Sequence, residues 1–357
     1  MSIFLITGNL GYIGPVLEEA IKKDDPSAVI IGCDSGYFRS SFLENNYKSS
    51  RSYADVQYYL DVRNVNKIQD IVRLHRVDHI IHLAAISNDP MGKEFELVTN
   101  EINHLASINL AKIAFECDVS SFTFASSCSV YGAGGNTAKT ELDDINPLTA
   151  YAKSKINTES SLVSLVDSSP KSTKVTCLRF ATACGASPRI RLDLVLNDFV
   201  ATALSTGNIS ILSDGTPYRP LIDVHDMASL LIWSTKRVHG DQFEIYNAGG
   251  NYSNYQVKDL AYRVQSTVNS EIDITINDNA PPDKRSYQVN FDKLYNHADP
   301  KYLPSKTLDD SISMMINFMK DKVSEVHPKN RENLIRLATL RAHIKSLQLD
   351  NQLFWNN

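Results

Sequence analysis

Short apolar runs alternate with segments of helical periodicity over the first half of the chain, and this alternation restricts the fold more than any other feature. The runs are IFLIT, AVIIGCD, VQYYLDV, DHIIHLAA, SSFTFASS and KVTCLRF. Between them, the spacing of apolar residues predicts helices over 11–23, 64–75, 95–117 and 149–166. Strands that helices cover on both faces have such continuous apolar runs. The pattern therefore predicts an α/β fold with a doubly wound parallel sheet over residues 1–180.

Residues 181–323 have a different pattern, which predicts a smaller α+β cap. Short strands such as NISIL, PLIDV, EIYNAG and IDITIN are separated there by loops with proline. Helices are expected near 190–205, 225–237, 254–267 and 307–322. Segments at about 220–250 are expected to return to the first domain.

The pattern of apolar residues over 324–357 predicts a C-terminal amphipathic helix. Its apolar residues recur at steps of three and four, which places them on one helical face: Leu334, Leu337, Leu340, Ile344 and Leu347. That face packs either on its own chain or on a partner subunit, and the pattern leaves both alternatives open.

Composition restricts the classes of partner. The formal net charge of -5 and the pI of about 6.0 give no electrostatic reason to expect nucleic acid or an anionic membrane. The five cysteines lack CxxC and Cys/His spacing, so we expect no disulfide framework and no metal site, and a reducing cytoplasmic location. No apolar run is long enough for a signal peptide or a membrane span.

The first apolar run leads directly into TGNLGYIG, where Gly8, Gly11 and Gly14 recur at a predicted strand-to-helix turn. Glycine permits positive φ there and lets the backbone approach a pyrophosphate, while the helix N-terminus offers free N–H groups to the anion. A tight structural turn alone would also explain the glycines. A second feature favours a dinucleotide, because Asp34 follows Gly14 by twenty residues at the end of the second predicted strand.

An acidic residue in that place accepts hydrogen bonds from the ribose 2′-hydroxyl and repels a 2′-phosphate. Asp34 therefore indicates NAD, with a Rossmann-type first domain. Arg39 lies near enough in the sequence to keep NADP as an alternative.

The sequence YAKSK places Tyr151 and Lys155 on one face of a predicted helix, shortly after the serine-rich strand end FASSCSVYG. A phenol with a pKa near its reference value of about 10 is a poor base at neutral pH. A nearby ammonium lowers that pKa because it favours the phenolate. Tyrosine then accepts the proton of a substrate hydroxyl while hydride leaves the same carbon for a nicotinamide.

Together these motifs resemble an extended short-chain dehydrogenase/reductase of the NAD-dependent nucleotide-sugar epimerase/dehydratase branch. The resemblance covers about residues 1–320 and includes LDV, HLAA, INHLASINL, SSCSVYG, DGTPYRPLIDVHDMA and NAGG. It implies that Ser127 bonds the reacting sugar hydroxyl, that Tyr151 is the acid/base, and that Lys155 holds the nicotinamide ribose. Asn103 falls on the asparagine that supports the active-site backbone.

The resemblance also implies two sets of contact residues. Those expected at the cofactor are Gly8, Gly11, Tyr12, Ile13, Gly14, Asp34, Asp61, Val62, Leu83, Ala84, Ala85, Asn103, Tyr151, Lys155 and Phe180. Those expected at the substrate are Ser127, Ser129, Thr182, Arg189, Arg191, Asn197, Arg219 and Arg285. Arg219 matches the arginine that grips the diphosphate, and Arg285 a second such group. A surface charge or a salt bridge remains an alternative for each arginine.

The residues after Ser127 discriminate between reactions. Similar 4,6-dehydratases have an Asp and a Glu there, whereas this chain has Cys128 and Ser129, which cannot supply the acid and base of an elimination. We therefore expect an NAD-dependent epimerase of a nucleoside-diphosphate sugar that acts through a transient keto-sugar. An NAD(P)-dependent dehydrogenase or 4-ketoreductase is the alternative, ahead of a 4,6-dehydratase, a decarboxylase or a non-enzymatic dinucleotide sensor. By resemblance, the chain forms a homodimer through 95–117 and 149–166.

Overall fold

The computed structural model describes residues 1–43, 53–133, 135, 137–277, 280 and 285–356. Within them, seven parallel strands form one sheet in the order β10-β6-β5-β4-β1-β2-β3. The strands are β1 (Ile3–Thr7), β2 (Val29–Asp34), β3 (Val56–Tyr59), β4 (His79–His82), β5 (Ser121–Ser127), β6 (Lys174–Phe180) and β10 (Phe243–Ala248). The prediction of a doubly wound, Rossmann-type α/β fold is confirmed.

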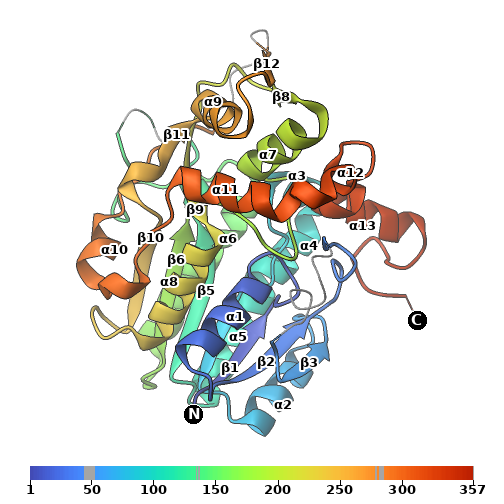
Figure 1. Ribbon diagram of the computed structural model, residues 1–357. Helices are drawn as coiled ribbons and strands as arrows, with labels where there is room; N and C mark the ends of the chain where they lie inside the picture. The colour runs from blue at the N-terminus through green and yellow to red at the C-terminus, as the bar shows by residue number, and fades with distance from the viewer. Residues whose placement is uncertain (44–52, 134, 136, 278–279, 281–284, 357) are drawn as a thin grey trace.

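Helices cover both faces of this sheet (Figure 1). One face packs against α1 (Gly14–Asp24) and α8 (Val224–Lys236), and the other against α2 (Val65–His75), α5 (Ser107–Glu116) and α6 (Ala150–Ser168). Side chains of β1 alternate accordingly: Phe4 and Ile6 join the first cluster, and Leu5 the second. Because both faces are buried, the strands have the continuous apolar runs seen in the sequence.

The cap lies over the carboxyl ends of the strands (Figure 1). It contains a sheet of β11 (Asn254–Gln256), β9 (Tyr218–Asp223) and β7 (Thr182–Cys184), and a parallel pair of β8 (Asn208–Ile211) with β12 (Asp273–Ile276). The helices α7 (Val195–Thr206), α9 (Val257–Val268) and α11 (Leu308–Met319) share its apolar core. In the sequence, α8 and β10 come between the cap elements β9 and β11. They pack on or pair with the large sheet, so the chain returns there before it completes the cap. The domain boundaries themselves stay a prediction.

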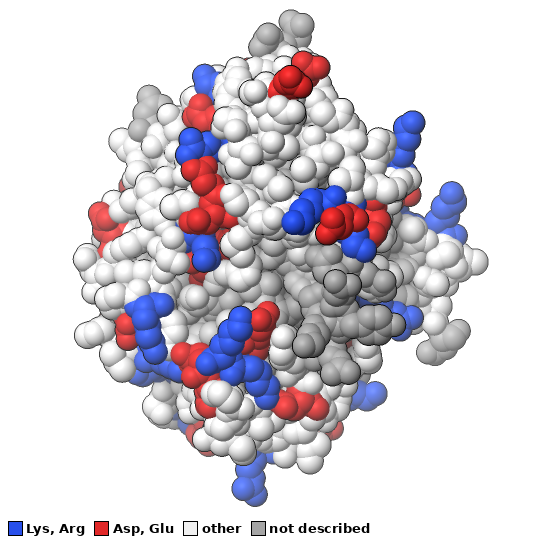
Figure 2. Space-filling view, viewed as in Figure 1, with Lys and Arg blue, Asp and Glu red and all other residues white. Residues whose placement is uncertain are grey.

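Short helical segments connect the two layers. They include α3 (Asp89–Glu94), α4 (Glu96–Asn100), a π-helical segment η1 (Glu101–Ala106), a 3-10 turn η2 (Cys128–Tyr131) and α10 (Asp292–His297). Basic and acidic side chains lie interspersed on the face shown in Figure 2. Ion pairs of the described residues include Lys22–Asp55 and Arg263–Asp309. Within the described residues, no helix combines the length and the apolar character that crossing a bilayer requires.

The tail departs from its prediction. The prediction of one helix over 324–357 is wrong. The described segment contains a short α12 (Val323–Val326) and a separate α13 (Arg336–Lys345). Pro328 cannot continue a helix, and Leu347 has a left-handed φ of 58° that ends the second one. Residues Leu349 and Trp355 then pair as an antiparallel bridge.

The buried apolar residues of the tail pack on their own chain. Leu340, Leu349 and Leu353 join a cluster with residues that follow β2, β3 and β4, such as Tyr37, Val62 and Ile86. Leu347, by contrast, is 78% exposed and does not belong to this face. Of the two alternatives for the tail, the structure therefore shows packing within the chain.

Candidate active site

A cavity of about 1050 Å³ lies between the carboxyl ends of the large sheet and the cap. The chain moves from β1 to β2 on one side of the sheet and returns to β4 on the other side of β1, so a crevice opens between β1 and β4. Ligands of doubly wound sheets bind at such a switch point. The cavity is lined by the ends of these strands and by facing residues of the cap.

The glycine turn forms one wall. Gly8 has a φ of 75°, and a Cβ atom there would lie 2.6 Å from the backbone nitrogen of Ala84. A Cβ on Gly14 would lie 1.8 Å from the carbonyl oxygen of Asn9. Only glycine fits at these two positions, so the backbone of the turn stays open to a ligand in front of the N-terminus of α1. Gly8, Gly11, Tyr12 and Ile13 line the cavity, whereas Gly14 packs beneath the turn.

Asp34 stands at the end of β2 with its carboxylate held by backbone donors. It accepts hydrogen bonds from the N–H groups of Leu10 (3.1 Å) and Gly36 (2.7 Å). Burial raises the pKa of Asp34, and these two hydrogen bonds oppose the rise. The carboxylate lines the cavity in the place expected for a ribose clamp. Arg39, the residue that kept NADP as an alternative, is exposed and does not line it.

Other predicted cofactor residues surround the same end. Asp61 and Val62 line the cavity, and Asp61 is paired with Arg63 at 2.7 Å. Four more expected residues also line it: Leu83, Ala84, Ala85 and Phe180. Asn103 does not, because its buried amide bonds both backbone groups of Ile86, at 2.8 and 2.9 Å. It thereby holds the strand end that carries Leu83–Ala85, which agrees with a supporting role.

Ser127, Tyr151 and Lys155 all line the same cavity. Ser127 ends β5, while Tyr151 lies in the first turn of α6, where Thr149 caps the helix by accepting the Ala152 N–H at 3.1 Å. Burial raises the pKa of Tyr151 to about 12, and its hydrogen bond with Ser127 opposes that rise. Lys155 donates to the carbonyl oxygen of Ala125 at 2.7 Å, and burial lowers its pKa to about 7.

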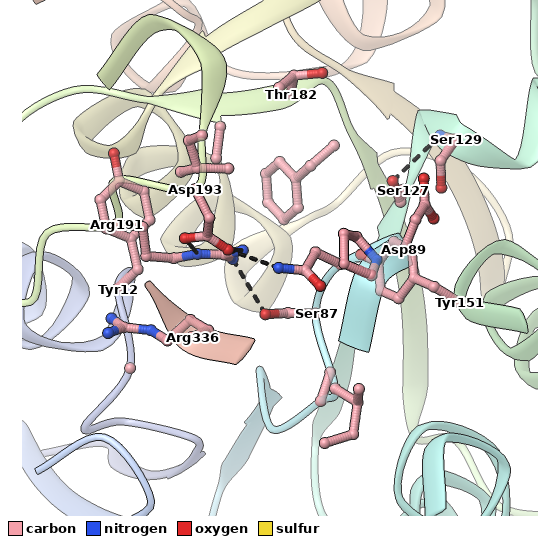
Figure 3. A pocket seen from close by; sticks show the side chains of 18 of the residues that line it. Tyr12, Ser87, Asp89, Ser127, Ser129, Tyr151, Thr182, Arg191, Asp193 and Arg336 are labelled. Atoms are coloured by element: carbon pink, nitrogen blue, oxygen red, sulfur yellow. Dashed lines mark hydrogen bonds and ion pairs between the residues drawn. The ribbon is translucent and has the colours of Figure 1, made fainter. Parts of the chain in front are cut away.

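The two residues after Ser127 lie in different environments. The Ser129 hydroxyl is buried at the cavity and has no hydrogen-bond partner among the described residues, while its N–H donates to Ser127 Oγ at 3.2 Å (Figure 3). Cys128 donates from Sγ to the carbonyl oxygen of Arg179 and is completely buried outside the cavity lining. Burial raises the pKa of its thiol. Cys128 is therefore a packing residue, and the Ser129 hydroxyl faces the ligand space.

The cap presents an ion pair. Arg191 donates two hydrogen bonds to the Asp193 carboxylate and one to Ser87 Oγ (Figure 3). Asn88 donates to the same carboxylate at 2.6 Å. Both charged residues line the cavity, as does Thr182. The pair as a whole is neutral, although the guanidinium of Arg191 keeps its positive charge.

Two predicted substrate residues lie elsewhere. Asn197 is fully buried behind the wall, where its amide bonds the Gly185 N–H, the Tyr12 hydroxyl and the Arg191 carbonyl oxygen. Arg189 donates to the carbonyl oxygens of Phe38 and Arg39, and its charge acts on Asp34 at the opposite end from the predicted sugar site. Neither residue lines the cavity, so the expectation of direct substrate contact from them is not met by this arrangement.

The predicted diphosphate arginines both line the cavity. Arg219 donates to the carbonyl oxygens of Tyr218 (2.8 Å) and Arg285. Arg285 forms an ion pair with Asp89 of α3 at 2.8 Å, which joins the cap to the first layer across the cavity mouth. A planar guanidinium suits paired contacts with phosphate oxygens.

Sequence reasoning missed five charged lining residues: Asp89, Asp193, Asp198, Arg331 and Arg336. Asp89 accepts from Thr149 Oγ1 at 2.7 Å and contributes its charge to the surroundings of Tyr151. Its position as the first residue of α3, directly after the HLAA strand end, was the available signal. Arg331 pairs with Asp198 at 2.6 Å, and Arg336 begins α13. No periodic pattern distinguishes these two from other tail residues.

The residues present fit a nicotinamide dinucleotide. A glycine cradle that any Cβ would fill, a clamped carboxylate after β2 and a serine–tyrosine–lysine set share one cavity. They define the class as a dinucleotide-dependent enzyme of the extended short-chain dehydrogenase/reductase type. The chain belongs to the NAD dependent epimerase/dehydratase family, whose model matches residues 4–249. NAD is accordingly its cofactor.

Individual relatives agree with this assignment. A UDP-glucuronate 4-epimerase of Thermodesulfobacterium geofontis (strain OPF15) is 26% identical over 259 residues, which cover 70% of this chain and 76% of the relative. A UDP-glucose 4-epimerase of Lactobacillus helveticus is 24% identical over 279 residues, covering 73% and 81%. The crystal structure of UDP-glucose 4-epimerase from Bifidobacterium longum in complex with NAD+ and UDP superposes with a TM-score of 0.75 at 19% identity, covering 90% of this chain and 99% of that one. At this identity the superposition shows the fold.

Among the described residues, no group of three or more His, Cys, Asp or Glu side chains is arranged to hold a metal ion. The five cysteines are unpaired, and four of them are buried.

Proposed function

We propose that this protein is an NAD-dependent 4-epimerase of a uridine-diphosphate sugar. The observation that carries the proposal is the convergence of Ser127, Tyr151 and Lys155 on the cavity that also contains the glycine turn, Asp34 and Arg219. In this proposal, one cavity holds the dinucleotide, the diphosphate of the substrate and the acid/base. The UDP-sugar 4-epimerases among the relatives support this substrate class.

The residues divide the binding work. Gly8, Gly11 and the N-terminus of α1 would hold the dinucleotide's phosphates, and Asp34 its ribose. NAD, when bound, supplies a reversible hydride acceptor. Lys155 would bond the nicotinamide ribose, and Arg219 with Arg285 would bind the diphosphate of the sugar nucleotide.

The chain's own chemistry is a proton transfer at one oxygen. Ser127 and Tyr151 would both bond the sugar's 4-hydroxyl, and Tyr151 Oη would take its proton as the hydroxyl becomes a ketone. Inversion requires the keto-sugar to present its other face, after which Tyr151 returns the proton to the new 4-hydroxyl. Ser129 would bond a neighbouring sugar oxygen, because its buried hydroxyl lacks a partner among the described residues.

Absence of the acidic pair after Ser127 supports epimerisation over dehydration. Cys128 is buried with its thiol pKa raised, so it does not serve as the acid that expels a sugar hydroxyl. With NAD as the hydride acceptor, proton transfer by Tyr151 and Ser127 would suffice for oxidation and reduction at one carbon.

The test incubates the purified protein with UDP-glucose, UDP-N-acetylglucosamine or UDP-glucuronate in D2O, without added reductant. We expect the 4-epimer of at least one sugar, with its C4 hydrogen retained, because hydride returns to the carbon that it left. Steady NADH absorbance should accompany the turnover. Net NADH formation would instead indicate a dehydrogenase, and deuterium at C4 would contradict the hydride route.

Two variants sharpen this test. Tyr151→Phe should reduce turnover by about 10²- to 10⁴-fold, the usual contribution of a general acid/base. Tyr262→Phe, at a half-exposed tyrosine of α9, is the matched control and should act as wild type. Dinucleotide released by denaturing the fresh protein should be near-stoichiometric, since a redox-neutral cycle regenerates NAD in place.

We further propose a homodimer through α4, η1, α5 and α6. These helices pack together and expose Leu97, Leu105 and Val163, which are 81%, 48% and 36% exposed. Sedimentation at micromolar concentration should give the mass of two chains, and Leu97→Asp with Leu105→Asp should give one. A monomeric wild type would contradict the proposal.

A further inference from the structure

Arg336 is a buried arginine that reaches the cavity from outside the segment that the family model matches. It is the first residue of α13, and its side chain is 2% exposed. Nη2 donates to the carbonyl oxygen of Arg189 at 2.8 Å. Nη1 is also buried, and it has no hydrogen-bond partner among the residues that the structure describes. Buried donors are normally paired, so this nitrogen indicates a ligand contact.

The position of Arg336 relates it to the glycine turn. Its partner Arg189 donates a backbone N–H to Ser187 Oγ at 3.2 Å, and Ser187 Oγ donates to the carbonyl oxygen of Tyr12 at 2.7 Å. Figure 3 shows Arg336 below Tyr12 and Arg191. A short series of hydrogen bonds thus fixes the guanidinium beside the turn that is expected to receive the dinucleotide's phosphates.

The charges around Arg336 favour an anion. The groups that act on it are Arg191, Asp193, Arg189 and Asp34. Arg191 and Asp193 form their own ion pair at 2.7 Å, which leaves Arg336 and Arg189 against the single carboxylate of Asp34. Burial, followed by the charge of Arg191, lowers the pKa of Arg336 to about 9. A phosphate oxygen would offset the lost hydration of this cation.

The tail that carries Arg336 also holds the loop after Asp34. Trp355 Nε1 donates to the carbonyl oxygen of Ser35 at 2.7 Å, and Tyr37 Oη donates to that of Leu353 at 2.5 Å. The Arg336 guanidinium itself lies 4.7 Å from the centre of the Phe38 ring. The tail therefore contacts three residues, 35, 37 and 38, directly beyond the expected ribose clamp.

We propose that Arg336 binds the pyrophosphate of the dinucleotide and that the C-terminal tail closes the adenosine end of its site. This inference rests on NAD binding and not on the reaction of the proposed function. The substrate diphosphate is the competing ligand of the same chemistry. Arg336 is assigned to the dinucleotide because the turn and Asp34 are its neighbours, whereas Arg219 and Arg285 join the cavity from the cap.

Equilibrium binding tests the proposal without measuring turnover. The full-length protein, freed of dinucleotide, is titrated calorimetrically with NAD, adenosine and UDP. Arg336→Met should weaken NAD binding about 10- to 100-fold, the effect of losing one charged hydrogen bond. Adenosine, which lacks phosphate, and UDP should bind as to wild type. Arg336→Lys keeps the charge without the planar fork and should lose less affinity.

Arg341→Met is the matched control, because Arg341 lies on the same helix, is exposed and pairs with Glu94. It should bind NAD as wild type does. Thermal denaturation without ligand checks the fold of each variant, and Arg336→Lys decides the question if the methionine variant unfolds. Unchanged NAD affinity in the Arg336 variants would overturn the proposal, as would a loss confined to UDP.

Discussion

The Nζ atom of Lys155 lies 5.6 Å from the centre of the Tyr151 ring and donates to the carbonyl oxygen of Ala125. The two residues are one helical turn apart on α6. Burial raises the pKa of Tyr151, and the groups that oppose this rise are Ser127 and Arg191, so Lys155 is expected to act through what it binds. Burial lowers the pKa of Lys155 to about 7, so a charged ammonium is costly at this position.

Lys155→Met should separate function from stability. Loss of the ammonium removes the group expected to hold the nicotinamide ribose, so we expect weaker NAD binding and at least about 100-fold slower turnover. The free energy of unfolding should stay equal or rise, because methionine fills the site without a buried charge. Lys153→Met, at an exposed position of the same helix, is the control. Urea denaturation showing a marked loss of stability in Lys155→Met would contradict this account.

Ser127→Ala should shift the pH dependence of turnover. The hydrogen bond with Ser127 lowers the pKa of Tyr151, so its removal leaves burial as the main influence and raises that pKa further. Since the phenolate is the base, the rising limb of kcat against pH should move to higher pH, with about tenfold or greater loss at pH 7.

Ser129→Ala is the companion variant. The Ser129 hydroxyl does not bond Tyr151 in the described structure. We therefore expect KM to rise in this variant, while the rising limb of kcat against pH keeps its position. Identical pH profiles for wild type and Ser127→Ala would exclude a role of the Ser127–Tyr151 hydrogen bond in lowering the pKa of Tyr151.

The sequence predicted those parts of the candidate site that lie on regular elements or at their ends. Gly8 directly follows β1 and Asp34 ends the neighbouring β2, and parallel strands bring their carboxyl ends to one edge. Tyr151 and Lys155 lie four residues apart on one helix, which fixes their common face. For these residues, the regular geometry of the strand or helix determines which way the side chain points.

Residues on loops could not be placed in the same way. Arg189 lies in the loop before α7, and Asn197 lies in the first turn of that helix. Which side chains of this stretch face the cavity depends on hydrogen bonds to Tyr12 and Phe38, which are distant in sequence. Arg336 enters from the tail, whose apolar stripe predicted one continuous helix. The position of α13 instead depends on contacts of Leu340 and Leu353 with the residues around Tyr37. Such contacts are tertiary and leave no periodic signal.

Asp34→Ser should change the choice of dinucleotide. The carboxylate repels a 2′-phosphate, while the N–H groups of Leu10 and Gly36 and the nearby charge of Arg189 would attract one. We expect the NADP-to-NAD ratio of affinities to rise at least about tenfold. Asp34→Asn, which keeps the shape without the charge, should give a smaller change. If neither variant changes the NADP-to-NAD ratio of affinities, the dinucleotide ribose does not bind at Asp34.

His82 should make the stability of the fold depend on pH. It is 1% exposed in the core of β4, with Nδ1 at 2.6 Å from Thr7 Oγ1 and Nε2 at 2.7 Å from Ser107 Oγ. Burial, followed by the charge of Lys155, lowers its pKa to about 3. The unfolded chain binds a proton below about pH 6.5 and the folded chain does not, so stability is lost as pH falls from 6.5 toward 3.

The loss attributable to His82 should reach about 1.4 kcal/mol per pH unit, or about 2 kcal/mol between pH 6.5 and 5. His82→Gln should be about 1 to 3 kcal/mol less stable at pH 7, since a buried hydrogen bond is lost, but it should decline less on acidification. Urea denaturation of both proteins at pH 7 and pH 5 measures the difference. A parallel decline of wild type and His82→Gln would show that the imidazole accepts a proton inside the folded chain.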